Sequence, residues 1–336
     1  WYSNFGPLVL EFEARLAERL GLPSKGVATV ANATMGLSLS LQATGAPRGT
    51  LCLLPSWTFS ASVHAVVEAG LIPFFVDVDD EGRLTPALAR EALDAAQSAV
   101  GAVMPVSVYG QPIDPTPWEE FSEATGLPIV IDAAPGFDGV RAGRVISVVS
   151  LHATKVLGVG EGGFVMSSNT ALVAEVRRKS NFGFDGSREA QVAGGNGKIS
   201  EYAAAVGLAC LDEWLERRAA LVTAARHYQG NLSTLDGISQ PLGWGESWCS
   251  TTCVVRLDRP AASVAAALNA SGIETRAWWG DGMHVNRAFA GYPRMPLPTT
   301  ECLAETTIGL PFFIDMTADE IDRVCGMLAQ ELAHRR

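Results

Sequence analysis

The sequence predicts a three-layer α/β/α domain with a mostly parallel sheet, followed by a smaller α+β domain. Between residues 26 and 168, short apolar runs alternate with helical stretches. Runs that are apolar throughout belong to strands covered on both faces, the pattern of parallel sheets with helices on either side. The predicted strands are Val27–Val30, Leu51–Leu54, Ile72–Val76, Ala102–Val106, Ile129–Ile131, Val145–Leu151 and Phe164–Met166.

Helices are predicted in the intervals between these strands. Several begin at Thr or Ser, the residues that favour helix N-caps. The predicted helices are Thr34–Thr44, Phe59–Ala69, Thr85–Ala95 and Trp118–Ala124.

The pattern changes near Ser200. Residues 201–226 are one long helical stretch, and residues 237–250, rich in Gly, Pro, Ser and Trp, indicate a linker. A length of 336 residues, at about 150 residues per domain, also favours two domains. We expect a large domain at residues 1–240 and a small domain at residues 241–336. The small domain's predicted elements are strand Thr252–Leu257, helix Ala261–Ser271, strand Thr275–Ala277 and helix Thr317–His334.

Composition excludes several classes of protein. Apolar residues make up 48% of the chain and charged residues 18%, enough for a buried core and too few charges for a disordered chain. The 25 basic and 36 acidic residues leave a net charge of −11, which repels phosphate backbones and anionic membrane surfaces. No apolar run approaches the roughly 18 residues that span a bilayer. We therefore expect no nucleic-acid or membrane partner.

Cysteine usage indicates a reducing compartment. The six cysteines are dispersed without a CxxC motif, as expected of free thiols. We interpret the one close pair, Cys249 and Cys253, as buried thiols rather than a disulfide or a metal site. With no basic leader before an apolar stretch, we expect a cytoplasmic protein. The chain begins at Trp1 instead of methionine, so we expect a natural N-terminal segment to be missing from it.

The segment Gly158–Gly163 matches GxGxxG but lacks the context of a dinucleotide site. That fingerprint needs a strand directly before it and a helix after it. Here a loop separates it from the preceding strand, and another predicted strand follows. The chain has no GxSxG motif, and its five histidines lack the spacing of metal ligands. Serine-triad hydrolysis and metal catalysis are therefore not supported.

Two charged residues follow predicted strands at the carboxyl edge of the sheet, where α/β proteins bind ligands. Lys155 is one of only four lysines, and Asp132 ends the apolar run 127–131. A buried carboxylate needs a positive partner. Sites for pyridoxal phosphate combine a lysine that forms a Schiff base with the cofactor and an aspartate that pairs with its protonated pyridine nitrogen. Thr34 begins a predicted helix, whose free amides suit a phosphate. Taken singly, Lys155 fits a surface loop and Thr34 a helix cap.

In sequence order, these residues resemble the DegT/StrS-like sugar aminotransferases. Those fold-type I enzymes use pyridoxal phosphate to aminate keto sugars attached to nucleotides. The resemblance runs from residues 4–7 to the last helix. Its motifs are Pro55–Phe59, Phe75–Asp79, Val108–Pro112, Asp132–Ala134, Ser150–Lys155, Glu161–Gly163, Gly195–Glu201 and Leu310–Asp315.

This resemblance implies the catalytic residues and the contacts of the cofactor ring. Lys155 is implied as the Schiff-base lysine and proton carrier, and Asp132 as the partner of the pyridine nitrogen. Phe59 is expected to stack on one face of the ring, and Ala134 to pack on the other. A lysine at position 155 argues against the related dehydrases, which carry histidine there.

The resemblance also implies a phosphate site that two subunits share. Thr34, the Met35 backbone and Ser150 are expected to hold the phosphate. Asn196 is expected to reach the phosphate of the neighbouring subunit's cofactor, which implies an isologous homodimer with active sites at the interface.

A loop over residues 275–284 contains candidate substrate residues. Arg276 suits a carboxylate or a phosphate, and the Trp278 indole suits a sugar or a base. We expect these two residues and His284 to contact substrate; an aromatic plug between the two domains is the alternative.

The predicted function is transfer of an amino group from an amino acid, expected to be L-glutamate, to a keto carbon of a dTDP-linked keto-deoxysugar. Tyr109 and His152 are further candidate substrate residues. Many relatives carry Gln or His at the position of Pro135, and His at the position of Ser107. Sugar recognition is therefore expected to differ from theirs. Alternatives are amination of a keto-cyclitol or related precursor, a non-catalytic pyridoxal-phosphate sensor and, more remotely, a nicotinamide oxidoreductase.

Overall fold

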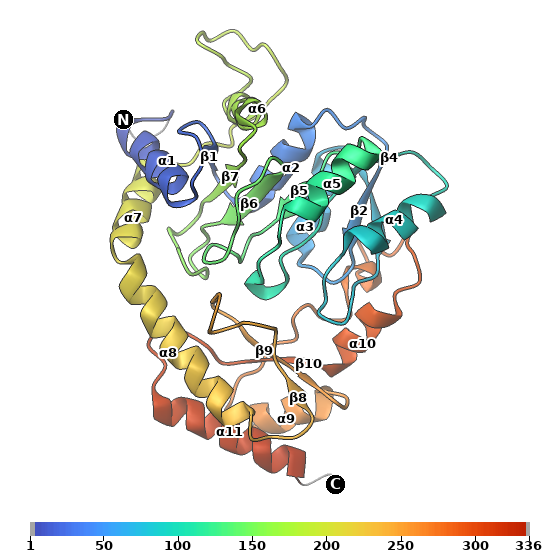
Figure 1. Ribbon diagram of the computed structural model, residues 1–336, viewed down its shortest axis with the longest axis vertical. Helices are drawn as coiled ribbons and strands as arrows, with labels where there is room; N and C mark the ends of the chain where they lie inside the picture. The colour runs from blue at the N-terminus through green and yellow to red at the C-terminus, as the bar shows by residue number, and fades with distance from the viewer. Residues whose placement is uncertain (1–3, 334–336) are drawn as a thin grey trace.

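The computed structural model describes residues 4–333, and a large mixed sheet lies at the centre of its N-terminal part (Figure 1). The strand order is β1-β7-β6-β5 in one section and β4-β2-β3 in the other. Parallel bridges join the two sections through β4 and β5, at Val103–Ile129 and Val106–Asp132. The strands are β1 Val27–Val30, β2 Leu51–Pro55, β3 Ile72–Val76, β4 Val100–Val103, β5 Val130–Asp132, β6 Ile146–Ser150 and β7 Gly163–Met166.

The sheet is mostly parallel, as predicted. Strand β2 runs parallel to β3 and β4, and β5 runs parallel to β6. Strand β7 is antiparallel to both β1 and β6, because it returns from β6 through a loop without a crossover helix. Strand β4 ends at Val103 rather than at the predicted Val106. Pro105 explains the early end, because proline has no N–H to donate to a ladder.

Helices cover both faces of this sheet (Figure 1). The four predicted helices are confirmed within one or two residues at each end. The stretch predicted as one helix over residues 201–226 is two, because the chain breaks at Glu213. Two further helices, α1 and α6, were not predicted. The helices are α1 Pro7–Arg19, α2 Ala33–Ala43, α3 Ser60–Glu68, α4 Pro86–Ala95, α5 Thr116–Thr125, α6 Thr170–Ser180, α7 Glu201–Asp212 and α8 Trp214–Leu232.

The C-terminal part contains a small antiparallel sheet with strand order β10-β9-β8. Helix α8 packs against α11 beneath this sheet (Figure 1). The prediction of a strand at Thr275–Ala277 is wrong: Arg276 makes only an isolated bridge with Gly309. The end of the last predicted helix, His334, lies outside the described residues. The elements are β8 Ile238–Ser239, β9 Cys253–Leu257, α9 Ala262–Ala270, α10 Pro298–Thr306, β10 Thr307–Leu310 and α11 Ala318–Ala333.

A segment from the C-terminal part returns to the edge of the large sheet. The amide of Phe75 in β3 donates to the carbonyl of Pro293 at 3.0 Å, and the amide of Met295 donates to the carbonyl of Phe75 at 2.9 Å. The Asp77 carboxylate accepts the backbone amides of Thr299 and Thr300 at the start of α10, at 2.9 and 2.8 Å. The edge strand β3 is therefore covered by chain from beyond residue 240. The division at residue 240 stays a prediction.

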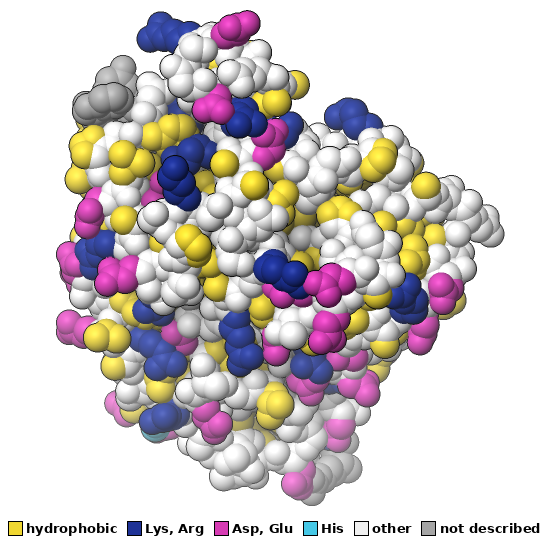
Figure 2. Space-filling view, turned by 45° about the horizontal axis from the view of Figure 1, so that its top comes forward, with side chains coloured by type: hydrophobic (Ala, Val, Ile, Leu, Met, Phe, Trp, Pro, Cys, Tyr) yellow, Lys and Arg dark blue, Asp and Glu magenta, His cyan; other side chains and the backbone are white. Residues whose placement is uncertain are grey.

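Basic and acidic side chains are interspersed over the face shown in Figure 2. Among residues 4–333, no helix combines the length and the apolar character needed to cross a bilayer.

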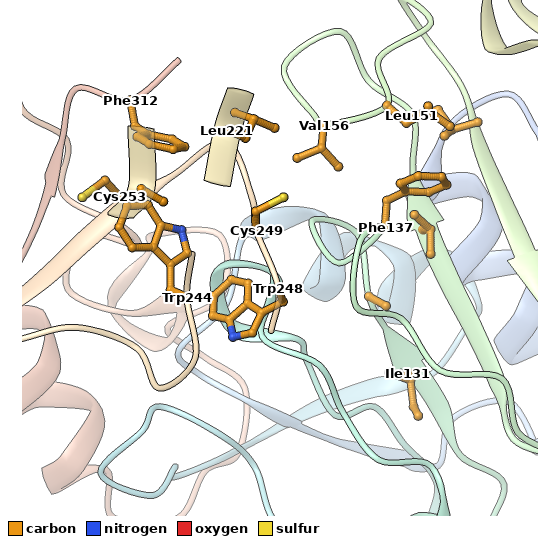
Figure 3. Packing of buried hydrophobic residues seen from close by; sticks show 14 of the residues in the cluster. Ile131, Phe137, Leu151, Val156, Leu221, Trp244, Trp248, Cys249, Cys253 and Phe312 are labelled. Atoms are coloured by element: carbon orange, nitrogen blue, oxygen red, sulfur yellow. The ribbon is translucent and has the colours of Figure 1, made fainter. Parts of the chain in front are cut away.

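One buried cluster extends from the large sheet into the C-terminal part (Figure 3). It contains Ile131 of β5 and Phe137 together with Trp244, Cys253 of β9 and Phe312. All six cysteines are free, and the predicted burial of Cys249 and Cys253 is confirmed, with 0% of each side chain exposed.

Candidate active site

Lys155 lies in the loop that connects β6 to β7. Main-chain hydrogen bonds across this loop join Leu151 to Gly162 at 2.9 Å and Ala153 to Gly160 at 2.8 Å, and the Lys155 amide donates to the His152 carbonyl at 2.8 Å. A Cβ atom on Gly158 would lie 2.7 Å from the Ala153 carbonyl oxygen, so only glycine fits there. The loop that carries Lys155 is thus closely held by its own backbone.

Asp132 is the last residue of β5, beside the strand that leads to Lys155. Its side chain is 4% exposed. One carboxylate oxygen accepts the Ser62 hydroxyl of α3 at 2.7 Å, and the other accepts the Ala134 amide at 3.0 Å. The Ala134 carbonyl in turn accepts the Ser150 amide at 3.1 Å, which ties the ends of β5 and β6 together.

The electrostatics of Asp132 and Lys155 are coupled. Burial raises the pKa of Asp132, whereas the Ser62 and Ala134 hydrogen bonds and the Lys155 charge oppose this rise. Burial lowers the pKa of Lys155, and the Asp132 charge acts in the opposite direction. Desolvation disfavours the charged form of each group. The result is a lysine that loses its proton more readily than a free one, beside a carboxylate that a further cation would stabilise.

The start of α2 lies next to the end of β6. Register pairs Gly163 of β7 with Val30 of β1 on one side and with Ser150 of β6 on the other. A Cβ on Gly163 would lie 2.9 Å from the backbone nitrogen of Ala33, so glycine allows this close approach. Ser150 is 6% exposed. The predicted phosphate residues Ser150 and Thr34 are therefore held at adjoining ends of β6 and α2.

The first amides of α2 are only partly occupied. The side chain of Asn32, the N-cap, accepts the Met35 amide at 2.9 Å. The predicted phosphate donor at Met35 therefore already has a partner within the chain. The amides of Ala33 and Thr34 lie in the first turn, where no carbonyl of the helix lies four residues before them, so they have no partner within α2 and are suited to an anion.

Phe59 and Asn196 are two further predicted cofactor residues. Phe59 is the N-cap residue of α3, and 55% of it is exposed. Asn196 lies in the loop between α6 and α7, part of which extends from the top of the molecule in Figure 1. Its side-chain oxygen accepts the Lys198 ammonium at 2.7 Å, so its amide N–H₂ group is left to donate elsewhere.

Pyridoxal phosphate fits these residues. The buried Asp132 carboxylate matches a protonated ring nitrogen, and Lys155 supplies the amine that holds the aldehyde carbon. The amides at the start of α2 match the phosphate, and the exposed ring of Phe59 matches a flat aromatic partner.

Tyr109 and His284 hold the loop over residues 275–284, here called the aromatic loop, in place. The Tyr109 hydroxyl accepts the Trp57 indole N–H at 3.1 Å and donates to the Trp278 carbonyl at 3.2 Å. Its ring stacks on Trp279 with centroids 4.9 Å apart, and burial raises its pKa. His284 is 4% exposed and bonds to another buried side chain through Nδ1. Both predicted substrate residues therefore carry contacts within the protein.

Arg276 and His152 have partners outside the buried site. The Arg276 guanidinium is 67% exposed and pairs with Glu274 at 3.0 Å. His152, beside the lysine loop, bonds to the Thr154 hydroxyl at 2.9 Å and lies 3.7 Å from Glu161. Among residues 4–333, no hydrogen bond or ion pair brings Arg276 to Lys155, whereas His152 accompanies Lys155 in the same loop.

Several residues that support the site were not predicted from the sequence. Ser62 and Thr58 form a hydroxyl chain to Asp132, and Trp57 and Trp279 pack around Tyr109. Ser62 lies two residues into α3, where a serine looks like an ordinary first-turn residue. Only the proximity of α3 to the end of β5 reveals its partner.

Comparison with known proteins places these features in a family context. The model of the DegT/DnrJ/EryC1/StrS aminotransferase family matches residues 1–329. The GDP-perosamine synthase of Caulobacter vibrioides is 30% identical, over 99% of this chain and 92% of its own. The erythromycin biosynthesis sensory transduction protein EryC1 of Saccharopolyspora erythraea is 31% identical, over 98% and 91%. The crystal structure of DesI in the presence of its TDP-sugar product has a TM-score of 0.88 and 33% identity, over 99% and 86%.

Proposed function

The chain belongs to the DegT/DnrJ/EryC1/StrS aminotransferase family, and we propose that it moves an amino group from L-glutamate to a keto carbon of a dTDP-linked keto-deoxysugar. It is a pyridoxal-phosphate-dependent aminotransferase with the fold of its family. The observation that carries the proposal is the placement of Lys155 and buried Asp132 at one edge of the sheet, next to the open N-terminus of α2.

The cofactor, when bound, supplies an electron sink for the negative charge that forms on the substrate carbon. In the proposal, Lys155 holds the cofactor covalently and, once an amino donor has displaced it, moves the proton at that carbon. Its pKa, lowered by burial, favours the neutral amine that this task needs. Asp132 keeps the ring nitrogen protonated, and the hydrogen bonds from Ser62 and Ala134 keep its carboxylate in position.

Phosphate binding is assigned to Ser150, Thr34 and the amides that begin α2. Phe59 and Ala134 are assigned to the two faces of the ring. The exposed ring of Phe59 supports its assignment, and Ala134 is fixed by hydrogen bonds to both Asp132 and Ser150.

We propose that the working unit is a homodimer in which Asn196 completes the partner's phosphate site. The surface near its loop supports this. Leu10 of α1 is 53% exposed, and Tyr202 and Val206 of α7 are 77% and 47% exposed. Helices α1 and α7 pack side by side, and Figure 2 shows hydrophobic side chains gathered at the upper left edge, where α1 lies. A second copy of the chain is the occupant that would bury this apolar face.

The substrate class rests on the relatives. GDP-perosamine synthase is named for a nucleotide-linked sugar, and the product of DesI is a TDP-sugar. We favour dTDP because DesI, at 33% identity, was crystallised with a TDP-sugar product. Arg276, although paired with Glu274 on the surface, remains the proposed contact for the diphosphate, with Trp278, His284, Tyr109 and His152 as further proposed substrate residues. The free cysteines support a cytoplasmic location.

A non-catalytic sensor is the second candidate, because one relative, EryC1, is named a sensory transduction protein. The presence of Lys155 and Asp132 together favours catalysis over this role.

An absorbance experiment tests both candidates. The holoprotein is expected to show a visible cofactor band that collapses on addition of L-glutamate and returns on addition of a nucleotide-linked keto-deoxysugar. A panel of dTDP- and GDP-linked 3-keto and 4-keto sugars then identifies the acceptor. A band that no amino donor changes would favour the sensor, and activity only on a keto-cyclitol would overturn the proposed substrate.

A further inference from the structure

A chain of buried hydroxyl groups connects the first turn of α3 to the carboxylate of Asp132. The Thr58 hydroxyl lies 2.7 Å from the Ser62 hydroxyl, and Ser62 lies 2.7 Å from Oδ2 of Asp132. Thr58 and Ser62 are both 0% exposed. No solvent reaches either group, so each must find its hydrogen-bond partner inside the protein.

The direction of this chain follows from the ionised state of Asp132. An ionised carboxylate only accepts hydrogen bonds, so Ser62 must donate its single proton to Oδ2. The Ser62 oxygen is then free only to accept, and Thr58 must be its donor. The chain therefore runs from Thr58 through Ser62 to Asp132, and each bond polarises the next.

The backbone fixes the position of Ser62. It lies in the first turn of α3, and its amide donates to the carbonyl of Phe59 at 3.1 Å. The N-terminal end of a helix carries partial positive charge, which favours an anion nearby. One short segment thus presents the proposed ring-stacking side chain of Phe59 and the donor to Asp132.

Few charged groups act on this carboxylate. Lys155 faces Asp132 from the loop after β6. On α3, the titratable residue nearest in sequence to Ser62 is His64, whose ring lies 5.0 Å from that of Phe289. Among residues 4–333, the second oxygen of Asp132 accepts only the Ala134 amide, at 3.0 Å. Among the described residues, Ser62 is therefore the only side-chain hydroxyl that donates to Asp132, and its hydrogen bond must supply much of the stabilisation of the ionised carboxylate.

We propose that Ser62, with Thr58 behind it, is a positioning residue that keeps Asp132 ionised and oriented toward the ring nitrogen of the cofactor. This inference rests on the proposed role of Asp132 at that nitrogen. Charge-assisted hydrogen bonds are about twice as strong as neutral ones. Removing the donor while leaving the carboxylate buried favours the protonated, neutral acid, which cannot pair with a protonated ring.

The test compares the variants Ser62→Ala, Ser62→Thr and Thr58→Val with the matched control Ser60→Ala. Ser60 occupies the same turn and has no hydrogen bond to Asp132. Two quantities are measured on the apoprotein: the Kd of pyridoxal phosphate from tryptophan quenching, and the pH at which this affinity falls on the acid side. Because loss of a donor to the ionised form raises a carboxyl pKa, that acid limb should move to higher pH.

For Ser62→Ala we expect Kd to rise about tenfold and the acid limb to move up by about one pH unit. Thr58→Val should move both in the same direction by less, Ser62→Thr should keep the limb near its wild-type position, and Ser60→Ala should change neither quantity. A weaker affinity with an unmoved limb would reveal a packing effect and overturn the proposal, as would a Ser62→Ala variant that matches Ser60→Ala. If Ser62→Ala does not fold, Thr58→Val decides by the same limb.

Asp132→Asn separates this inference from the proposed function. If Asp132→Asn weakens cofactor binding and Ser62→Ala does not, only the role of Ser62 fails. If Asp132→Asn leaves binding unchanged, or the wild-type apoprotein does not bind pyridoxal phosphate, the assignment of Asp132 itself fails.

Discussion

Ser56 and His284 are separated by 228 residues in sequence, yet the Ser56 hydroxyl lies 2.8 Å from Nδ1 of the His284 ring. The His284 amide also donates to that hydroxyl, at 3.1 Å. Ser56 directly follows β2, and His284 ends the aromatic loop. The pair therefore fastens that loop to the carboxyl edge of the sheet, where the proposed active site lies.

Stability should depend on pH through His284. Burial lowers the pKa of His284 from its usual 6.5, so the unfolded chain binds a proton that the folded chain resists. This contribution is fully present above about pH 6.5 and is lost as the pH falls through the unfolded value toward the folded one. Urea unfolding between pH 8 and pH 5 should show a smaller loss for His284→Gln than for the wild type. Equal losses would mean that another group controls acid stability.

Replacement of Lys155 by alanine should abolish transamination, because Lys155 is the residue proposed to move the proton. The cofactor should remain bound without a covalent link, so that borohydride treatment followed by mass spectrometry detects no adduct on the chain. Lys25→Ala, at an exposed turn, serves as the control and should retain full turnover. Residual transamination by the Lys155→Ala variant would contradict the assignment.

Gly163→Ala should disturb the junction between β7 and α2. The new Cβ would lie 2.9 Å from the Ala33 nitrogen, a backbone atom that cannot move alone. We expect a loss of about 1–3 kcal/mol in the free energy of unfolding and weaker cofactor phosphate binding. Gly230→Ala is the control, because nothing lies within 4 Å of its Cβ and it is inside α8. That change should stabilise the protein by about 0.5–1 kcal/mol. Urea denaturation measures both values.

Mixed dimers test whether two chains build each site. Lys155→Ala and Asn196→Ala chains should each be impaired alone. In a mixed dimer, the site on the Asn196→Ala chain has its own Lys155 and the partner's Asn196, so it is complete. Random mixing after dissociation should restore about a quarter of the wild-type sites. Activity that equals the average of the two parent variants would show that Asn196 acts within its own chain.

Sequence patterns predicted the large sheet well because its strands are buried on both faces. Strand β3, Ile72–Val76, is apolar throughout, and both of its ends were predicted at the correct residue. The second sheet was predicted less well. Strand β10, Thr307–Leu310, contains Thr and Gly, and its pairing with β9 depends on contacts distant in sequence. A strand was predicted at Thr275–Ala277, but the hydrogen bonds between Arg276 and Gly309 form only a single bridge.

Within the site, the sequence identified charged residues better than the residues that support them. Lys155 and Asp132 stand out because charge at the end of an apolar run has few structural explanations. The packing of Tyr109 could not be predicted, since nothing in a sequence shows that the Trp57 indole donates to its hydroxyl and the Trp278 carbonyl accepts from it. Ser62 is equally hidden, because a hydroxyl in a helix turn has many ordinary uses.

The covering of β3 by residues 293–295 has a consequence for how the protein folds. An uncovered edge strand exposes unpaired backbone groups to other chains. During synthesis, the first 240 residues emerge before the segment that covers this edge and before Thr299 and Thr300, whose amides donate to Asp77. The edge of the large sheet therefore stays uncovered until residues 293–300 have been synthesised. We therefore expect aggregation to compete most strongly with folding in that interval.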